Sequence, residues 1–490
     1  MTERNKENIC IGLLAAALPF THLLDVGYRL PSFEVWSVSA LYFLLGASLS
    51  NLLSRFSLQP IVAATTLFAF GCVYFVNAAK LSTPVLFVLF FLILILLIRM
   101  GKSLIPVAAV FAVVFSLSNA LVPGKQNFAR LEEPAKSLKP KPAPQNALLH
   151  IILDEQASLA SLASTIPANH SALSIYDDYK KRGFKLYPTV RSSNPLTRHS
   201  LTELVSLRND KENLAEHGTK DSHTFAAKRN EMFERLQTEG YHLHVFQSEY
   251  LDFCAGDNLI KCNTYPMWNM DVFERSGLNL SDRFVTALDF VSNEYMNPES
   301  GRYFGAYGKL AGNLVAKRNG YKISPWPLKS FEVMEQLKIE LENLEPGDVF
   351  FAHLLVPHYP YLMRADCKVK APSKWASPIR TQNNLPSKQI EAAYWDQVAC
   401  VHKKILQILD VIADKPFTTV MIHGDHGARL YYGTVQENEK DNLDTFFAVQ
   451  NPNGQYFLNE TKPFLSNVFA KEFEAFLKGR EFEEALVPTN

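Results

Sequence analysis

The sequence predicts an α/β protein in two parts: N-terminal transmembrane helices, followed by a domain whose central sheet is largely parallel and flanked by helices. Two observations predict this. Roughly the first quarter of the 490 residues is strongly apolar, whereas the rest has the mixed composition of a soluble domain. In that second part, short apolar runs alternate with charged or amphipathic helical stretches, which is typical of a parallel sheet.

The apolar part contains five stretches that approach the length of a membrane span. A hydrocarbon core about 30 Å thick takes about 20 apolar residues as a helix. The first stretch is short and could be read as a signal peptide, but no small-residue cleavage site follows it and four more stretches do. The stretches are Ile9–Leu24, Trp36–Leu53, Pro60–Ala79, Pro84–Ile98 and Ile105–Val122.

The basic residues of the short loops predict the orientation of these spans. A cytoplasmic N-terminus places most of them inside and leaves the C-terminal part outside; losing one span would reverse this. The chain is therefore expected in the inner (plasma) membrane as a multi-pass protein, with its C-terminal domain periplasmic or extracellular. The inside residues are Arg4, Lys6, Arg55, Arg99 and Lys102, and the outside ones are Arg29 and Lys80.

We expect three regions: a transmembrane domain at 1–122, a linker at 123–146 and an extracytoplasmic domain at 147–490. Prolines and lysines without hydrophobic periodicity indicate an extended linker, or an arm packed on the edge of the domain. Lys and Arg number 49, as do Asp and Glu, and no basic tract is present, so no nucleic-acid partner is expected.

The extracytoplasmic part contains four cysteines, Cys254, Cys262, Cys367 and Cys400. An even number outside the cytoplasm allows two disulfides. Cys254 with Cys262 closes a short loop and leaves Cys367 for Cys400; four free thiols are the alternative. No CxxC pair occurs, which is evidence against a structural zinc ribbon.

Four apolar runs predict buried strands of a parallel sheet, and three of them follow a predicted helix. The strands are Ala147–Leu153, Tyr241–Phe246 after the helix Glu231–Leu236, Asp348–Leu355 after Phe331–Leu341, and Phe417–Ile422 after Val398–Ile412.

Carboxylates and imidazoles follow three of these strands. Ligands of open α/β sheets bind outside the carboxyl ends of the strands. Asp154 and Glu155 follow the first predicted strand, His358 follows the third, and Asp425 and His426 follow the fourth. The sequence therefore predicts a site where these strand ends meet.

The HGDHG motif supplies the strongest metal signal. Neighbouring side chains of a strand point to opposite faces, so Asp425 and His426 converge only where the backbone leaves strand geometry, which Gly424 and Gly427 permit. A carboxylate with an imidazole suits zinc or manganese. A turn with a satisfied histidine is the alternative.

Asp154 is the natural third ligand, because a carboxylate that ends a buried strand needs compensation. It could instead cap a helix, and Glu155 could take its place. The segment RSSNPLTRHSLTEL adds hydroxyls at the predicted start of a helix, Thr197 and Ser200. A hydroxyl near a metal becomes a nucleophile, and a helix N-terminus binds anions. A plain capping box with Glu203 is the alternative.

Together, ILDEQ, NPLTRHSLTEL, VPHYPY and HGDHG resemble the alkaline phosphatase superfamily. Within it they resemble the sulfatase-like branch with membrane-anchored phosphoethanolamine transferases and lipoteichoic acid synthases. The resemblance covers about Leu148–Val449. It implies an alkaline-phosphatase/sulfatase-like domain, one divalent metal (zinc or manganese, or calcium if sulfatase-like) and a catalytic threonine. The implied metal ligands are Asp154, Thr197, Asp425 and His426, Thr197 is the implied nucleophile, and His358, with His353 and Arg198 as further candidates, contacts the substrate.

The nucleophile segment departs from both subfamily patterns. Thr202 stands where the transferases have a proline, and the stretch from Ser193 to Arg198 is one residue too long for the formylglycine motif of sulfatases. A formylglycine made from Ser193 is the alternative to a directly acting Thr197. A threonine nucleophile favours phosphoryl transfer over sulfate ester hydrolysis.

Three functions therefore stay open. The first is a transferase that moves a phospho-headgroup from a membrane lipid donor to a glycan or lipid acceptor. The second is a hydrolase of sulfate or phosphate esters at the same site. The third is a non-catalytic envelope scaffold, which is favoured by Thr202 and by Ala428-Arg429, where an acidic residue is more usual after HGDHG. The long segment Cys254–Tyr321 is expected to shape the acceptor pocket.

Overall fold

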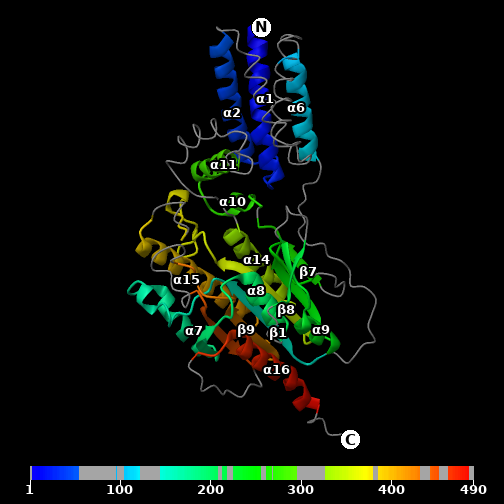
Figure 1. Ribbon diagram of the computed structural model, residues 1–490, viewed down its shortest axis with the longest axis vertical. Coiled ribbons are helices and arrows are strands. Elements are labelled where there is room, and N and C mark those ends of the chain that lie inside the picture. Colours follow the sequence, from blue (N-terminus) through cyan, green and yellow to red (C-terminus); the bar gives the residue numbers. More distant parts are fainter. Residues whose placement is uncertain are drawn as a thin grey trace. The chain divides into compact units, whose positions relative to one another are not determined.

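The computed structural model describes residues 3–54, 95, 104–121, 144–207, 212–217, 224–254, 261–267, 269–294, 326–378, 385–430, 442–451 and 462–484. By its internal contacts the chain divides into two compact units. The N-terminal unit holds Met1–Gln126 and Asn269–Ile323, and the α/β unit holds Asn127–Trp268 and Ser324–Asn490. Figure 1 shows the elements of both units.

Among the described residues of the N-terminal unit, α1 packs against both α2 and α6. Two helices, at Arg4–Asp25 and Phe33–Leu53, are long and apolar enough to cross a membrane, and Ile105–Val114 is a shorter apolar helix. The predicted spans Pro60–Ala79 and Pro84–Ile98 lie outside the described residues except for Ile95, so a multi-pass anchor stays a prediction. The helices are α1 (Glu3–Asp25), α2 (Phe33–Leu53) and α6 (Leu104–Leu121).

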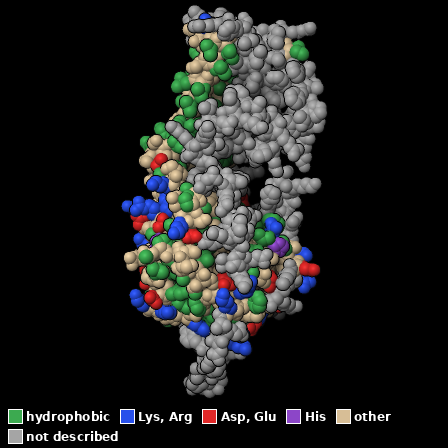
Figure 2. Space-filling view, turned by 60° about the vertical axis from the view of Figure 1, so that its left-hand side comes forward, with side chains coloured by type: hydrophobic (Ala, Val, Ile, Leu, Met, Phe, Trp, Pro, Cys, Tyr) green, Lys and Arg blue, Asp and Glu red, His purple; other side chains and the backbone are tan. Residues whose placement is uncertain are grey.

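Large apolar side chains are exposed on the surface of these helices. Figure 2 shows hydrophobic side chains along the N-terminal helices, whereas charged side chains are scattered over the α/β unit. Such a surface is unfavourable in water and suits a lipid environment. The exposed residues include Leu44, Leu45 and Leu52 of α2 and Val107, Val110 and Val114 of α6.

Part of the long segment after Cys254 belongs to the N-terminal unit and not to the α/β unit. It contains α10 (Val272–Arg275) and α11 (Leu280–Glu294), and α11 packs against α1 and α2. Arg283 of α11 holds the buried carboxylate of Glu34 at both oxygens, with Nη2 2.9 Å from Oε2. The expected boundaries, which keep all of 147–490 together, stay a prediction.

The α/β unit is built on a seven-stranded sheet with the order β2-β10-β9-β1-β8-β5-β7. Only β10 runs against its neighbours β9 and β2; the other neighbouring strands pair in parallel. The strands are β1 (Ala147–Asp154), β2 (Lys185–Arg191), β5 (His242–Ser248), β7 (Lys261–Tyr265), β8 (Asp348–Pro357), β9 (Thr418–Gly424) and β10 (Asp444–Gln450).

Helices cover both faces of this sheet (Figure 1). The apolar side chains of α8, α9 and α16 form one buried cluster with β1, β5, β8, β9 and β10, while α14 and α15 pack on β8 and on each other. A small sheet of β3 (Leu214–His217), β4 (Thr224–Ala227) and β6 (Leu251–Asp252) lies beside α8. The helices are α7 (Ile175–Lys181), α8 (Thr197–Val205), α9 (Glu231–Thr238), α14 (Trp326–Leu341), α15 (Ser387–Val411) and α16 (Leu465–Glu484).

The four predicted strands and the three predicted helices between them are confirmed, as is the largely parallel sheet. The sequence patterns did not reveal β2 and β10, which extend the sheet on one side: β10 pairs with β9, and β2 pairs with β10. Cys254 is bonded to Cys262 and Cys367 to Cys400, the same pairs that the spacing suggests.

Breaking the Arg283–Glu34 pair should destabilise the N-terminal unit. Arg283→Met leaves a fully buried carboxylate without its cation, which costs roughly 3–5 kcal/mol. The double variant Glu34→Gln/Arg283→Met should recover part of this loss, because no unpaired charge remains. Thermal unfolding of the full-length protein in detergent measures both. Arg364→Met, which removes an exposed ion pair with Asp366, is the control and should cost less than about 1 kcal/mol. Equal losses for the two single variants would contradict the expectation.

Candidate functional site

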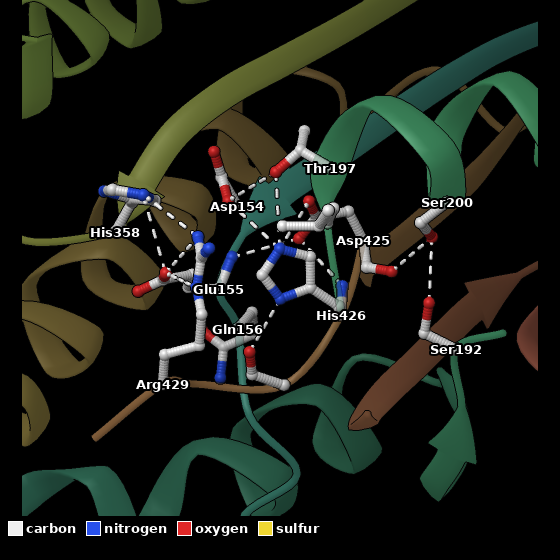
Figure 3. A network of polar contacts seen from close by, with 12 residues as sticks. Asp154, Glu155, Gln156, Ser192, Thr197, Ser200, His358, Asp425, His426 and Arg429 are labelled. Atoms are coloured by element: carbon white, nitrogen blue, oxygen red, sulfur yellow. Dashed lines mark hydrogen bonds and ion pairs between the residues drawn. The ribbon is translucent and has the colours of Figure 1, made fainter. Parts of the chain in front are cut away.

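The carboxyl ends of three adjacent strands bring acidic and imidazole side chains together. Asp154 ends β1, and the backbone N–H of Asp425, the residue after β9, donates to the carbonyl of Leu153 at 3.2 Å. His353 of β8 lies beside Ile152 in the register of β1 and β8. Ligand atoms of Asp154, His353 and Asp425 all lie within 4.8 Å of one another, and all three residues are buried. The predicted meeting of strand ends is present (Figure 3).

Two backbone N–H groups fix the carboxylate of Asp425. Its Oδ1 accepts from the N–H of Glu155 at 3.0 Å and from the N–H of His426 at 2.8 Å. Its Oδ2 is buried without a hydrogen-bond partner among the described residues. Glu155 has a φ of 61°, an unusual value for a residue with a side chain, and this backbone conformation accompanies the turn of its N–H towards Asp425.

Gly424 is needed for space and not for an unusual φ. A Cβ at this position would lie 2.7 Å from the carbonyl oxygen of Gln156 and would also collide with Thr445. The φ of Gly424 does not lie in the left-handed region. The sequence suggested that Gly424 permits a special turn. In the structure it instead allows the chain after β1 to approach the end of β9 closely.

His426 presents one ring nitrogen to the cluster. Its Nδ1 lies 2.7 Å from the carbonyl oxygen of Gly427, which requires the proton on Nδ1 and leaves the lone pair on Nε2. That Nε2 lies 3.3 Å from Oδ2 of Asp425 and 3.8 Å from Oδ1 of Asp154. This is the arrangement of a histidine whose second nitrogen is oriented by a carbonyl for metal binding.

His353 is a stronger metal-ligand candidate than the sequence indicated. The ring is fully buried, and neither nitrogen has a hydrogen-bond partner among the described residues. Burial lowers the pKa of His353 to about 3, so the ring is neutral and keeps an available lone pair. A buried imidazole normally satisfies at least one nitrogen, so these orphaned atoms point to a ligand.

Thr197 is the first residue of α8, and its side chain enters the same cluster. The hydroxyl donates to Oδ1 of Asp154 at 3.2 Å and lies 3.3 Å from Nε2 of His426. The helix is preceded by Leu196, which makes no side-chain cap. The capping-box alternative is therefore wrong: Ser200 donates instead to the carbonyl oxygen of Asp425 at 2.7 Å and pairs with Ser192 (Figure 3).

The alternative role of Asp154 as a helix cap is also wrong. No helix starts behind β1; the next element is a short 3₁₀ turn at Ala163–Thr165, preceded by Leu162. Arg198 does not join the acidic cluster, since its guanidinium lies over the ring of Phe225 at 4.6 Å. Ser193 points elsewhere as well and donates to Glu203 at 2.6 Å.

A second group of charges adjoins the first. Arg429 donates from Nε and Nη2 to Oε1 of Glu155, and its Nη2 lies 3.3 Å from Nε2 of His358. Burial raises the pKa of Glu155, but the charge and hydrogen bond of Arg429, together with His358 and His426, outweigh this and hold that pKa below its usual value. Glu155 is therefore a carboxylate with an internal counterion. The sequence showed Arg429 only as a departure from a family pattern.

Among the residues that the structure describes, the first group has no such counterion. Burial raises the pKa of Asp425 to about 7, and burial together with the charge of Asp425 raises the pKa of Asp154. Three buried carboxylates and the single guanidinium of Arg429 leave two negative charges uncompensated. One divalent cation held by Asp154, Asp425, His426 and His353, next to the hydroxyl of Thr197, would balance them. The donor set and the orphaned atoms fit the implied metal.

No model of a known protein family matches the chain, and no curated protein matches it by sequence. Several solved structures are similar in fold. The C-terminal periplasmic domain of the phosphoethanolamine transferase EptC from Campylobacter jejuni is 11% identical with a TM-score of 0.37, and covers 62% of this chain and 78% of its own.

Two further structures are similar to the same degree. The soluble domain of the lipooligosaccharide phosphoethanolamine transferase A from Neisseria meningitidis is 13% identical with a TM-score of 0.36, over 64% of this chain and 79% of its own. A putative sulfatase from Bacteroides fragilis is 11% identical with a TM-score of 0.38, over 72% and 77%. These are the two groups that the motifs resemble.

The cation site predicts a dependence of metal content on Asp425. Purified full-length protein should carry about one equivalent of zinc or manganese, and Asp425→Asn should lose most of it, because one oxygen is replaced by an amide that cannot offset the charge. Elemental analysis after dialysis measures this. His170→Gln, which changes a histidine that pairs with Asp396 outside the cluster, should keep the metal. Full retention by Asp425→Asn would place the metal elsewhere.

Proposed function

We propose that the protein is a metal-dependent transferase. It moves a phospho-headgroup, of phosphoethanolamine or phosphoglycerol type, from a lipid donor to an envelope glycan or lipid through an intermediate on Thr197. The observation that carries the proposal is the position of the Thr197 hydroxyl, which is buried between Asp154 and His426 at the start of a helix. No other described hydroxyl combines contact with both of these side chains.

Two displacements at phosphorus make up the reaction. In the first, a bond forms from Thr197 Oγ1 to phosphorus, the bond to the lipid oxygen breaks, and that oxygen takes up a proton in exchange for the one that the hydroxyl loses. In the second, an acceptor hydroxyl attacks, Oγ1 leaves and regains a proton. A divalent cation held by Asp154, Asp425, His426 and His353 would lower the pKa of the Thr197 hydroxyl and offset charge on phosphoryl oxygens.

The side chains of the protein prepare the first displacement. The Thr197 hydroxyl directs its proton at Oδ1 of Asp154, which leaves an oxygen lone pair for phosphorus. The N–H groups of His199 and Ser200 donate to the carbonyl oxygen of Leu196, so those of Thr197 and Arg198 precede the first helical hydrogen bonds of α8 and favour a negative charge near Thr197. Ser200 donates to the carbonyl oxygen of Asp425 and so fixes α8 to the end of β9. This holds the Thr197 hydroxyl at a constant separation from the carboxylates.

The sulfatase alternative receives less support from the side chains. Its nucleophile would be made from Ser193, but that hydroxyl donates to Glu203 at 2.6 Å, whereas Thr197 occupies the acidic cluster. A hydrolase that uses Thr197, with water as the acceptor, shares the first displacement with the transferase. The two apolar N-terminal helices favour lipid substrates, since an anchor would keep the catalytic unit near the bilayer.

Thr197→Ala should abolish transfer, because no oxygen remains to bond to phosphorus, while Thr197→Ser should keep measurable activity. The assay incubates full-length protein with phosphatidylethanolamine or phosphatidylglycerol labelled in the headgroup. Mass spectrometry then detects the headgroup phosphate on the peptide with Thr197, and thin-layer chromatography detects labelled acceptors.

Ser193→Ala is the matched control and should transfer normally. Label on Thr197 without any labelled acceptor would make the protein a hydrolase. An aldehyde at residue 193 with turnover of an aryl sulfate, and no label on Thr197, would overturn the proposal in favour of a sulfatase.

A further inference from the structure

We propose that Arg429 binds a negatively charged oxygen of the group that is transferred, and that the Glu155–Arg429 pair makes the site selective for singly charged groups such as phosphodiesters. This inference rests on the proposed function for the identity of the group. The pair itself is a feature of this chain, since the resemblance leads one to expect an acidic residue after HGDHG.

Glu155 lies deeper in the interior than Arg429 and His358 do. The side chain of Glu155 is fully buried, whereas that of Arg429 is 15% exposed and that of His358 is 13% exposed. The carboxylate therefore lies behind the guanidinium, and the accessible edge is that of Arg429 and His358.

The guanidinium has donors to spare. Nε and one N–H of Nη2 serve Oε1 of Glu155, and Nη2 also contacts His358. Nη1 makes no hydrogen bond with any described residue. A guanidinium fixed along one edge offers its other donors at a set position, which suits an oxygen of phosphate or sulfate. Fixing it beforehand lowers the entropy cost of binding.

Glu155 links the two charge groups. Its backbone N–H donates to Oδ1 of Asp425 at 3.0 Å, and its carboxylate accepts from Nε and Nη2 of Arg429. Asp425 belongs to the cluster that contains Thr197, so Arg429 and this cluster adjoin each other at Glu155 (Figure 3).

The charges of the site set the preferred charge of that anion. Asp154, Glu155 and Asp425 contribute three negative charges, and Arg429 with one divalent cation would contribute three positive ones. A phosphodiester then adds a single uncompensated charge, whereas a phosphate monoester adds nearly two at neutral pH. In a buried site of low dielectric constant the second charge is unfavourable. The Glu155–Arg429 pair therefore selects phosphodiesters over monoesters.

The test compares three full-length proteins, each checked for metal content and thermal stability. The probes are bis(p-nitrophenyl) phosphate as diester substrate, p-nitrophenyl phosphate as monoester and inorganic phosphate as ligand measured by calorimetry. Arg429→Met should raise the KM for the diester and the Kd for phosphate by about tenfold or more, the size of one charge-assisted hydrogen bond, with the metal retained. Arg429→Lys should lose less.

Glu155→Gln tests the effect of the net charge of the site separately from the contact that Arg429 makes with the anion. It keeps Arg429 and adds one positive charge to the site, so it should bind phosphate and the monoester more tightly and reduce the preference for the diester. Unchanged phosphate binding in Arg429→Met, or an unchanged preference in Glu155→Gln, would overturn the inference. If either variant loses its metal or unfolds, the Arg429→Lys protein decides by the same measurements.

Failure of the anion site at Arg429 and failure of the proposed transferase function give different results. Phosphate binding that depends on Arg429, in a protein that never labels Thr197, supports the anion site and rejects the transferase. Transfer through Thr197 at a rate that does not change in Arg429→Met supports the transferase and rejects the anion site at Arg429.

Discussion

The two oxygens of the Asp425 carboxylate have different roles, and the rest of the site depends on that difference. Oδ1 is held by the backbone N–H groups of Glu155 and His426, while Oδ2 faces Nε2 of His426 without a hydrogen bond. The first interaction ties the chain after β1 to the chain after β9. Glu155 adopts a left-handed backbone conformation at this point, where the chain leaves β1. One side chain is then left with the cluster at Thr197 and the other with Arg429.

Buried charge is the constraint that shapes both groups of side chains. A carboxylate in the interior needs a cation or several hydrogen-bond donors. Glu155 obtains its cation from the chain itself, through Arg429, whereas Asp154 and Asp425 have none among the described residues. The protein therefore separates its carboxylates into a pair that is complete and a pair that requires an ion. The orphaned ring of His353 falls in the second group, at the position where an ion would complete its bonding.

The α/β unit supplies rigidity to this arrangement. β1, β8 and β9 are the central strands of the sheet and are buried along nearly their whole length. The helix that carries Thr197 is fixed to the strand end by Ser200 and Ser192. The N-terminal unit is assembled in a comparable way, since Arg283 of α11 compensates the buried Glu34 of α2 across a separation of 249 residues. In both units an ion pair joins segments that are distant in the sequence.

The sequence by itself determined the central strands, the helices between them, the ligand candidates at the strand ends and the pairs of cysteines. It could do so because apolar periodicity and strand-end position are local properties that survive without knowledge of partners. The tertiary structure decided what each polar residue contacts. The role of Arg429 and the orphaned nitrogens of His353 depend on residues up to 274 positions away, as does the use of Ser200 as a tie to Asp425. The sequence patterns likewise gave no indication that Asn269–Ile323 groups with the N-terminal unit. The partners of buried charges are set by which residues the fold brings close together, and a local pattern of residues does not contain that information.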